Sequence, residues 1–315
     1  MINSKTWRKE GLIYNVDGTL PWAKSHAQIP TVDVLDESRL RIYYSTRDAG
    51  NLSRTSYIDV ASSRPNEVLN VCQTPILELG TPGSFDDCGI MPSWVLSHGG
   101  LKYLYYIGWN VRNTVPYHNS IGLAVSDDNG DTYRKLYDGP IMDRTASEPF
   151  FCATSCIHIE NGIWRNWYLS CTEWVTVHGK LEPRYNLKYA ESSDGINWRR
   201  EGIVAIDYAN DEEGGIVRAS VLKQPDGYLM WYSYRSHRDY RDNSLLSYRI
   251  GIARSQDGIK WERQDQSAGI DVSPDGWDSF MVAYPHVVDV AGKLHMFYNG
   301  NGFGKTGFGY AVQTQ

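Results

Sequence analysis

Carboxylate side chains stand at corresponding places in the chain, five to seven residues before a reference position in a short apolar strand. They are Asp86 and Asp87, Glu148, Glu212 and Glu213, and Asp278. Carboxylates that converge on one site repel each other, which raises the pKa of one and leaves another ionised. Glycoside hydrolysis uses such a pair, one as acid and one as base or nucleophile. The pattern predicts this chemistry, with Glu148 as acid and Asp87 as base or pKa-tuning group.

Other polar and aromatic residues on the same strands and loops are candidates for contacts with a substrate. They are Arg47, Trp109, Glu173, Trp174, Arg218, Arg235, Asp278, Tyr284 and His286. Aromatic side chains present an apolar face with a polar tip, which suits sugar stacking as well as strand packing. Trp22 and Tyr234 stand in corresponding loops.

A repeated segment of about 63 residues must position these side chains. Its second strand carries an aromatic residue at positions 44, 106, 168, 232 and 298, so the copies follow at intervals of 62 to 66 residues. Another strand lies about 12 residues upstream, and a third lies downstream. Three copies continue into Ser-x-Asp turns that resemble Asp boxes, at 126–133, 193–198 and 255–261. A fourth strand follows each of these turns.

The repeat predicts an all-β fold, a five-bladed β-propeller with four antiparallel strands per blade. Residues 1–315 form a single domain, with blades at roughly 20–75, 80–140, 145–207, 210–268 and 275–315 plus 5–15. The last copy lacks a fourth strand, whereas residues 7–11 repeat residues 198–202 almost letter for letter. The N-terminal strand is therefore expected to close the last blade. A β-sandwich, the main alternative, does not predict this period.

Several candidates also have structural explanations. Asp86 or Asp87 can cap a turn, residues 211–213 can form a solvated acidic turn, and His286 can be a satisfied core histidine. Arg218 is expected to face the central channel, where a charge must pair with a carboxylate or with substrate. No cofactor is predicted with certainty. A divalent metal in the channel, held by residues of several blades, is left open.

The composition excludes several classes of function. A net charge of −6 without a basic run argues against nucleic-acid binding, and no apolar stretch reaches the length of a membrane span. The five cysteines include no Cys-x-x-Cys pair, and Cys152 and Cys156 are too far apart along a strand to bridge. With no signal-peptide pattern, the expectation is a cytoplasmic protein with reduced thiols, whose partner is a small saccharide; an oligomeric state is not predicted.

The repeat and the carboxylates together resemble the five-bladed propeller glycoside hydrolases: the arabinanase and xylosidase group, the invertase and levansucrase group, and the mannoside phosphorylases. By position, Asp87 corresponds to the second-blade carboxylate, Glu148 to the third-blade acid, and His286 to a fifth-blade histidine near a central metal or water. The resemblance implies a carbohydrate-active enzyme acting on a small glycoside or activated sugar.

One departure from that family affects the predicted mechanism. The first-blade carboxylate is replaced by residues 24–26, Lys-Ser-His, and the nearest acids are Asp17 and Asp33. Either another carboxylate, such as Glu213, serves as base, or His26 does, since a histidine can transfer protons near neutral pH. Two alternatives stay open. One is a phosphorylase or other sugar-modifying enzyme, with a cationic cluster drawn from Arg47, Arg112, Arg218, Arg235 and Arg238. The other is a non-catalytic saccharide-binding propeller.

Overall fold

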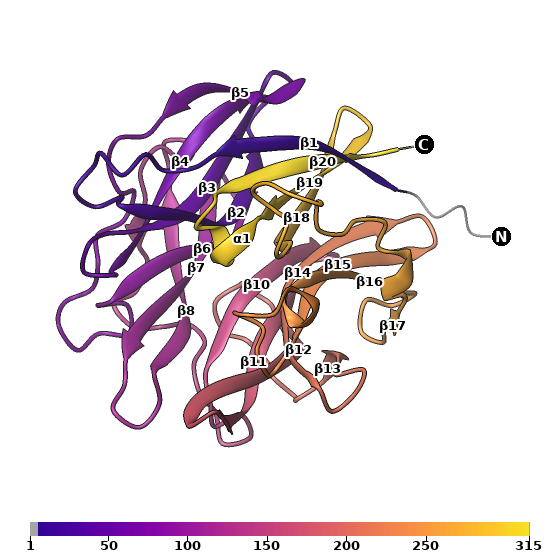
Figure 1. Ribbon diagram of the computed structural model, residues 1–315. Helices are drawn as coiled ribbons and strands as arrows, with labels where there is room; N and C mark the ends of the chain where they lie inside the picture. Colours follow the sequence, from indigo (N-terminus) through magenta and orange to yellow (C-terminus); the bar gives the residue numbers. More distant parts are fainter. Residues whose placement is uncertain (1–5, 315) are drawn as a thin grey trace.

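The computed structural model describes residues 6–314, and nearly all regular structure in them is β-strand. The strands form two eight-stranded sheets and one four-stranded sheet (Figure 1). The helical segments are short: the 3₁₀ turns η1 (Ser244–Leu246) and η2 (Asp265–Ser267) and the single turn α1 (Asn301–Gly304). The predicted all-β fold is confirmed.

The first eight-stranded sheet consists of two antiparallel four-stranded groups. Its strands are β2 (Ser25–Val34), β3 (Arg39–Arg47), β4 (Ser53–Ala61), β5 (Arg64–Val71), β6 (Gly89–His98), β7 (Leu101–Val111), β8 (Tyr117–Ser126) and β9 (Arg134–Lys135). The two groups are joined by one parallel pairing, between Ser53 of β4 and Gly89 of β6.

The second eight-stranded sheet has the same construction. Its strands are β10 (Cys152–Glu160), β11 (Ile163–Val177), β12 (Lys180–Ser192), β13 (Val204–Ile206), β14 (Glu213–Gln224), β15 (Gly227–Ser236), β16 (Arg249–Ser255) and β17 (Glu262–Arg263). Here the parallel pairing joins Tyr185 of β12 to Gly215 of β14. The repeated sequence therefore gives repeated strand groups.

The four-stranded sheet unites the two ends of the chain. It contains β18 (Ala283–Val290), β19 (Lys293–Asn299), β20 (Phe308–Gln313) and β1 (Trp7–Tyr14). β1 pairs antiparallel with β20, with Trp7 opposite Gln313. The predicted pairing of the N-terminal strand with the last copy is confirmed, and both ends lie side by side in Figure 1.

The first strand of each group lies at the centre of the molecule. Contacts run in a cycle, from β2 to β6, β10, β14, β18 and back to β2. Each of these strands also carries a register shift. In four of them a residue there has a positive φ angle: Ile29, Thr154, Arg218 and Tyr284. Such bulges bend a strand and redirect its side chains, so they shape the centre.

The Asp-box turns link neighbouring groups. In the turn of residues 193–198, the Asp194 carboxylate accepts the backbone N–H groups of Ile196 and Asn197, and Gly195 has a φ of +74°. Tyr105, from the preceding group, donates its hydroxyl to the Gly195 carbonyl. Asp194 therefore caps this turn, and Gly195 supplies the residue with a positive φ.

Three smaller observations complete the fold. All five cysteines are free thiols, in agreement with the expectation that Cys152 and Cys156 do not bridge. The core is rich in buried tyrosine and tryptophan, including Trp167 and Trp231. Among residues 6–314, none of the helices has the length and apolar character needed to cross a lipid bilayer.

Candidate functional site

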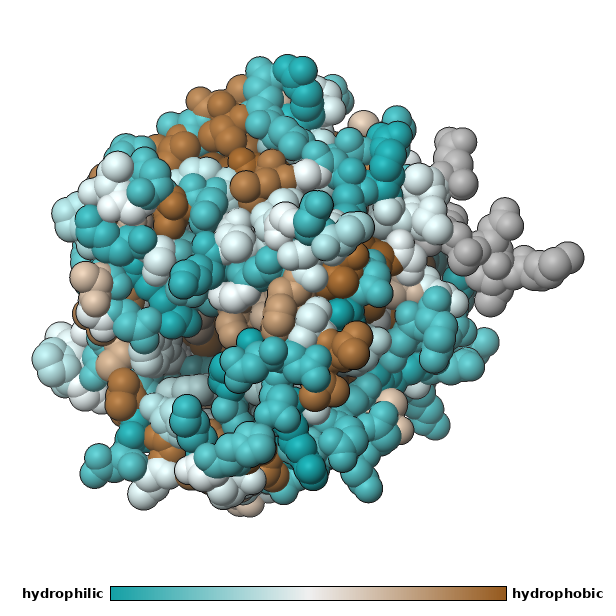
Figure 2. Space-filling view, viewed as in Figure 1, coloured by the Kyte–Doolittle hydropathy of each residue, from teal (hydrophilic) through white to brown (hydrophobic). Residues whose placement is uncertain are grey.

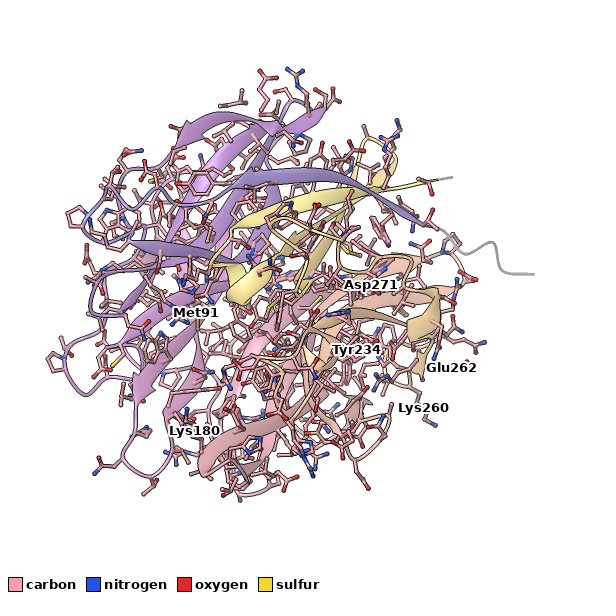
Figure 3. The ribbon with its side chains drawn as sticks, in the orientation of Figure 1. Met91, Lys180, Tyr234, Lys260, Glu262 and Asp271 are labelled. Atoms are coloured by element: carbon pink, nitrogen blue, oxygen red, sulfur yellow. The ribbon has the colours of Figure 1, made fainter. Side chains whose placement is uncertain are left out.

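A cavity of about 510 Å³ opens at the centre, and we call it the central pocket. All five first strands contribute to its lining, including Ile29 of β2, Met91 of β6 and Val217 of β14. Met91 is labelled in Figure 3, and Figure 2 shows a recess on the face that carries α1. The pocket is therefore a product of the whole cycle of strands.

Aromatic rings and neutral polar groups dominate its walls. The aromatic residues are Trp109, Tyr117, Phe151, Tyr185, Tyr240, Tyr248, Tyr284 and Phe303. The uncharged polar residues besides these tyrosines are Gln28, Asn51, Asn119 and Thr154. Flat apolar faces with hydroxyl and amide groups are suited to a polyhydroxylated ring.

Among the described residues that line the central pocket, the charged ones are Arg47 and Arg241, and none is Asp or Glu. Arg47 donates from Nε to the Gln28 amide oxygen (3.1 Å) and from Nη1 to that of Asn51 (2.7 Å). Burial lowers the pKa of the Arg47 guanidinium. The ion pairs formed within residues 6–314 do not include Arg47.

Arg235 lies behind the tyrosines of the wall and is 2% exposed. It donates to the hydroxyls of Tyr185 (3.0 Å) and Tyr248 (3.3 Å) and to the carbonyls of Pro183 and Ser236. Its guanidinium carbon lies 3.7 Å from the ring centre of Tyr240. Tyrosine faces and carbonyl dipoles thus stabilise this cation without a carboxylate.

Arg218 occupies the centre beneath the pocket and is fully buried. It donates to the carbonyls of Pro30 (3.2 Å) and Ser93, to the Thr31 hydroxyl (2.9 Å) and to Nδ1 of His286 (3.0 Å). Burial lowers the pKa of Arg218 to about 9, so it stays charged at neutral pH. Within residues 6–314 Arg218 therefore pairs with carbonyl, hydroxyl and imidazole acceptors in place of a carboxylate, and its Nε has no partner there.

His286 is a neutral structural residue of the centre. Its ring stacks on Trp94 at 4.6 Å, and Nδ1 accepts from Arg218 and from the Val32 backbone N–H (3.2 Å). Burial and the adjacent guanidinium hold the pKa of His286 well below its ordinary value.

A divalent metal at the centre, which the sequence left open, does not fit these residues. The Arg218 guanidinium already takes the His286 nitrogen and the strand carbonyls that would face a cation, and it would repel one. Within residues 6–314, no group of three His, Cys, Asp or Glu side chains is arranged to hold a metal ion.

The predicted carboxylates lie elsewhere, in a repeated arrangement that we call a latch. A latch joins a carboxylate at or before the start of the first strand, a tyrosine of the second strand, and a cation that lies on the fourth strand or in the segment leading to it. Three are complete: Asp86, Tyr106 and Lys135; Glu148, Tyr168 and Arg200; Asp278, Tyr298 and Lys9. The fourth latch pairs Glu213 with Arg263 at 2.7 and 2.8 Å, while Tyr232 donates to the neighbouring Asp265.

Glu148 shows how firmly a latch holds its carboxylate. It is 3% exposed and accepts from Arg200 (2.5 Å), the Tyr168 hydroxyl (2.9 Å) and the Ser170 hydroxyl (2.8 Å). Burial alone would raise the pKa of Glu148, but Arg200, Ser170 and Lys188 lower it below its ordinary value. A general acid at neutral pH requires a raised pKa, which is the opposite shift.

The latches face away from the central pocket. Ile107 and Leu169 line the pocket, and each follows a latch tyrosine, Tyr106 or Tyr168, on the same strand. Because successive residues of a strand point to opposite faces, these two tyrosines and their carboxylates lie on the other side of the sheet.

Asp87 and Glu173 also lie outside the pocket lining. Asp87 accepts the Gly83 backbone N–H (2.8 Å) and so caps its own loop, while the adjacent Asp86 forms the latch. Glu173 pairs with Arg184 at 2.8 Å. Trp174 packs edge-on against Tyr117, behind the pocket wall.

His26 lies on β2, two residues before the lining residue Gln28, and is half-buried with a φ of +65°. Its Nδ1 is 2.8 Å from the Ser25 hydroxyl. Burial, together with the nearby charges of Arg47 and Lys305, lowers the pKa of His26 to about 4. The imidazole is therefore neutral at neutral pH.

The first copy lacks a latch altogether. Its second-strand tyrosine, Tyr44, donates to the Tyr14 hydroxyl at 3.3 Å and packs against that ring. The nearest acids are engaged elsewhere, since Asp17 accepts from Thr19 and Asp33 pairs with Lys102. The missing first-blade carboxylate thus coincides with a missing cation.

Of the predicted residues, Arg47, Trp109 and Tyr284 line the pocket, while Arg218, Arg235 and His286 support it. Sequence reasoning missed Tyr117, Tyr185, Tyr240 and Tyr248. Tyr185 of β12 and Tyr248, directly before β16, stand at equivalent positions of two copies, three residues ahead of Lys188 and Gly251. Aligning the third strands would have revealed this pair.

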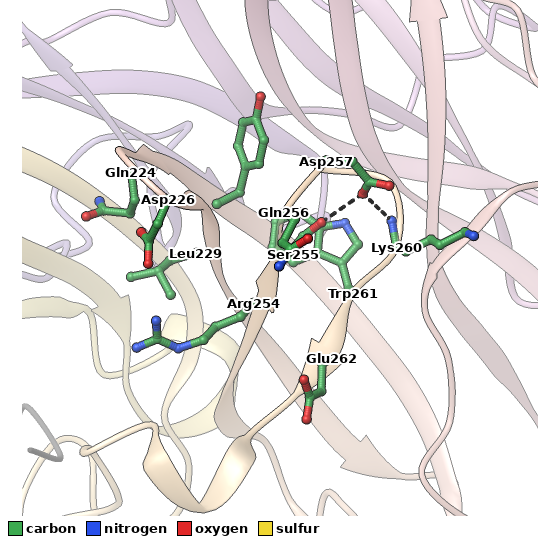
Figure 4. A pocket seen from close by; sticks show the side chains of 11 residues that line it. Gln224, Asp226, Leu229, Arg254, Ser255, Gln256, Asp257, Lys260, Trp261 and Glu262 are labelled. Atoms are coloured by element: carbon green, nitrogen blue, oxygen red, sulfur yellow. Dashed lines mark hydrogen bonds between the residues drawn. The ribbon is translucent and has the colours of Figure 1, made fainter. Parts of the chain in front are cut away.

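A second hollow of about 540 Å³ lies at the outer strands β15 to β17 (Figure 4). Its side chains carry both signs of charge, including Asp226, Arg254 and Lys260. Asp257 serves its own turn there, accepting from the Ser255 hydroxyl and the Lys260 backbone N–H. No set of convergent groups comparable to the central pocket appears among its described lining residues.

Comparison with known proteins gives relatives along the whole chain. No family model matches it. Two Mycobacterium tuberculosis proteins described as uncharacterized, MT1551 of strain CDC 1551 / Oshkosh and Rv1502 of strain ATCC 25618 / H37Rv, are each 36% identical over 306 residues, 97% of this chain and 98% of theirs.

Similar solved structures include three glycoside hydrolase-type proteins. The complex of BT0996 with RGII has a TM-score of 0.71 at 18% identity, covering 98% of this protein and 91% of that one. A thermostable family-43 glycoside hydrolase scores 0.64 at 17% identity, covering 93% and 90%. The α-L-arabinofuranosidase PaAbf62A of Podospora anserina, in complex with cellotriose, scores 0.63 at 12% identity, covering 98% and 96%. At these identities the likeness establishes the fold.

Proposed function

Because the chain belongs to the family of the Mycobacterium tuberculosis proteins MT1551 and Rv1502 and has the fold of the propeller glycoside hydrolases, we propose that it is a carbohydrate-active protein that binds a small saccharide in its central pocket. The neighbouring structures with RGII and cellotriose support a saccharide as the ligand class.

The architecture that we propose is one domain over residues 1–315, a propeller of five blades. Two observations support it. Each eight-stranded sheet divides at a single parallel pairing into two antiparallel groups, and the first strands of all groups contact one another in a cycle. The last blade would take β1 as its fourth strand.

The lining of the central pocket carries the functional proposal. Saccharides bind through ring stacking on aromatic faces and through hydrogen bonds to hydroxyl, amide and charged groups, and this lining offers each of these. A volume near 510 Å³ lies within the range of about 300 to 1,000 Å³ typical of small-molecule pockets.

For Glu148, Asp87, Glu213 and Asp278 we propose positions in the framework in place of acid and base roles. Inverting hydrolysis needs two carboxyl groups roughly 6.5 to 9.5 Å apart across the sugar, and retaining hydrolysis places them closer. The described lining residues of the central pocket include no carboxyl group. Glycosidase or phosphorylase activity would then use other groups, and His26, two residues before the lining residue Gln28, is a candidate.

Binding measurements test the proposal. Isothermal titration calorimetry with a panel of mono- and disaccharides should detect at least one ligand of micromolar to millimolar affinity. Trp109→Ala should weaken it at least tenfold, since the ring supplies a stacking face. Tyr137→Ala, at an exposed position outside the pocket lining, is the matched control. No binding by any saccharide, or undiminished binding to folded Trp109→Ala, would overturn it.

Hydrolysis of an aryl-glycoside panel tests the roles of the carboxylates. If the wild-type protein shows activity, Glu148→Gln should have the same kcat once the rate is divided by the concentration of folded protein. Loss of kcat in a variant with unchanged thermal stability would instead make Glu148 the acid.

A further inference from the structure

The central pocket contrasts with the rest of the molecule in its charge. The chain as a whole is acidic, with a net charge of −6. The described lining residues include two arginines and no carboxylate. A local excess of positive charge in a cleft of an acidic protein selects for anions, since field lines concentrate where low-dielectric walls exclude water.

Arg47 is held in place but not neutralised. Two side-chain amides accept from Nε and Nη1, and amide oxygens carry no net charge. No protein acceptor for Nη2 occurs among residues 6–314. Gln28 and Asn51 line the same pocket, so the guanidinium is anchored by groups of the site itself.

Other arginines of the chain have their charge compensated by carboxylates. Arg41 is 4% exposed and pairs with both Asp59 and Asp131. Arg200 and Arg263 pair with latch carboxylates. Arg47 departs from this pattern, since it has no carboxylate partner and burial lowers its pKa. An anionic ligand would supply the negative charge that no protein group within residues 6–314 offers to Arg47.

Other cations reinforce the field at this position. Arg235 lies behind the tyrosine wall and Arg218 beneath the floor, and neither forms an ion pair within residues 6–314. Arg241, at the lining, does pair with Glu182. Of the four arginines in or against the pocket, three therefore have no carboxylate partner within residues 6–314: Arg47, Arg218 and Arg235.

On the basis of the proposed saccharide site, we infer that the ligand is an acidic sugar whose charged oxygens bind Arg47. A planar guanidinium with a free N–H edge binds carboxylate and phosphate oxygens in the same way. The shared chemistry is an anionic oxygen on a saccharide, supplied either by a uronate carboxylate or by a phosphate ester.

Calorimetry with matched sugar pairs tests this inference. The probes are D-glucuronate and D-galacturonate, the 1-phosphates of D-glucose and D-galactose, the neutral parent sugars, and inorganic phosphate alone. At least one acidic sugar should bind tenfold or more tightly than its neutral parent, and its affinity should fall as salt rises. Whether a uronate or a sugar phosphate binds with the higher affinity identifies the source of the negative charge.

Variants of Arg47 complete the test. Arg47→Gln should remove the preference for the acidic sugar over its neutral parent, measured as the ratio of the two dissociation constants, and Arg47→Lys should restore part of that preference. Arg64→Gln, at an exposed surface arginine, is the control and should change nothing. Thermal unfolding establishes that each variant is folded. The pKa of His26, followed by NMR, should rise when the acidic sugar binds, because the anion offsets Arg47 and Lys305.

The outcomes separate this inference from the proposed function. Equal binding of neutral and acidic sugars, or a preference that survives Arg47→Gln, overturns the role of Arg47 and leaves the saccharide site standing. Binding of inorganic phosphate as tight as that of the sugar phosphates overturns recognition of an acidic sugar. Absence of binding by every sugar overturns both.

Discussion

Two regions of this protein, the latches and the surroundings of the central pocket, differ in how they compensate the charge of their buried or half-buried cations. In each latch a lysine or arginine, on the fourth strand or in the segment leading to it, meets a carboxylate. Around the pocket, Arg47, Arg218 and Arg235 meet amides, carbonyls, hydroxyls and rings. Burying a charge is costly unless it is compensated, so full compensation indicates a structural role, and partial compensation leaves room for a ligand.

The first copy sharpens the comparison. It lacks both the carboxylate and the cation, and Tyr44 bonds to Tyr14 in their place. If the carboxylates were catalytic, their cations would have no reason to be absent with them. If the carboxylate and the cation form a structural ion pair, we expect both to be absent together.

The largest expected effect comes from breaking a latch. Glu148→Gln leaves Arg200 buried without its carboxylate, at 7% side-chain exposure, and should lower the free energy of unfolding by about 3 to 5 kcal/mol. Urea unfolding followed by tryptophan fluorescence measures it.

Two variants control that measurement. Glu201→Gln breaks an exposed ion pair with Arg199 and should cost about 1 kcal/mol or less. Glu148→Gln combined with Arg200→Met removes both charges and should recover part of the loss. Equal stability of wild type and Glu148→Gln would contradict the structural role of the latch.

The next effect concerns the centre. Arg218→Met leaves the carbonyls of Pro30 and Ser93 without their donor and should cost about 2 to 4 kcal/mol. Differential scanning calorimetry with and without EDTA checks the related expectation that chelation does not lower the Tm of wild type. A drop in Tm with EDTA, reversed by a divalent cation, would contradict the assignment of Arg218 as the central cation.

Tyrosine hydroxyls give a smaller and more direct comparison between latched and unlatched copies. Tyr168→Phe removes a hydrogen bond to an ionised carboxylate and should cost about 2 kcal/mol. Tyr44→Phe removes a long bond between neutral hydroxyls and should cost about 0.5 to 1 kcal/mol. Similar losses in unfolding free energy would remove the distinction between the copies.

The smallest effect is a pH dependence at His26. Its pKa is lowered to about 4 in the folded protein, so between pH 6.5 and 4 the unfolded chain binds a proton that the folded one does not. This contribution to stability is present above pH 6.5 and is lost as the pH falls toward 4. Unfolding free energies measured across that range should fall less steeply for His26→Gln than for wild type; identical slopes would contradict the lowered pKa of His26.

Much of the fold could be predicted because each copy repeats the alternation that strands require. The likeness of residues 7–11 to 198–202 predicted the pairing of β1 with β20. The same likeness aligns Lys9 with Arg200, and matching these cations to Asp278 and Glu148 would have predicted the latches.

The site was less predictable, for two physical reasons. Arg218 bonds to backbone carbonyls, which no residue type marks in a sequence. Tyr240 and Phe303 reach the pocket from loops and a single helical turn, whose paths depend on the assembled molecule. The spacing correctly predicted that the carboxylates recur at equivalent positions of the copies. Spacing alone does not reveal on which face of a sheet a side chain lies.

The pairing of Trp7 with Gln313 has a consequence for how the protein is made. β1 is synthesised before the other described strands and its partner β20 after them, about 300 residues later. At roughly 5 to 20 residues per second, β1 waits some 15 to 60 s with an unpaired edge. The four-stranded sheet therefore cannot be completed until β20 has been synthesised, and a chain that stops short of β20 leaves the edges of β1 and β19 open to chaperones and proteases.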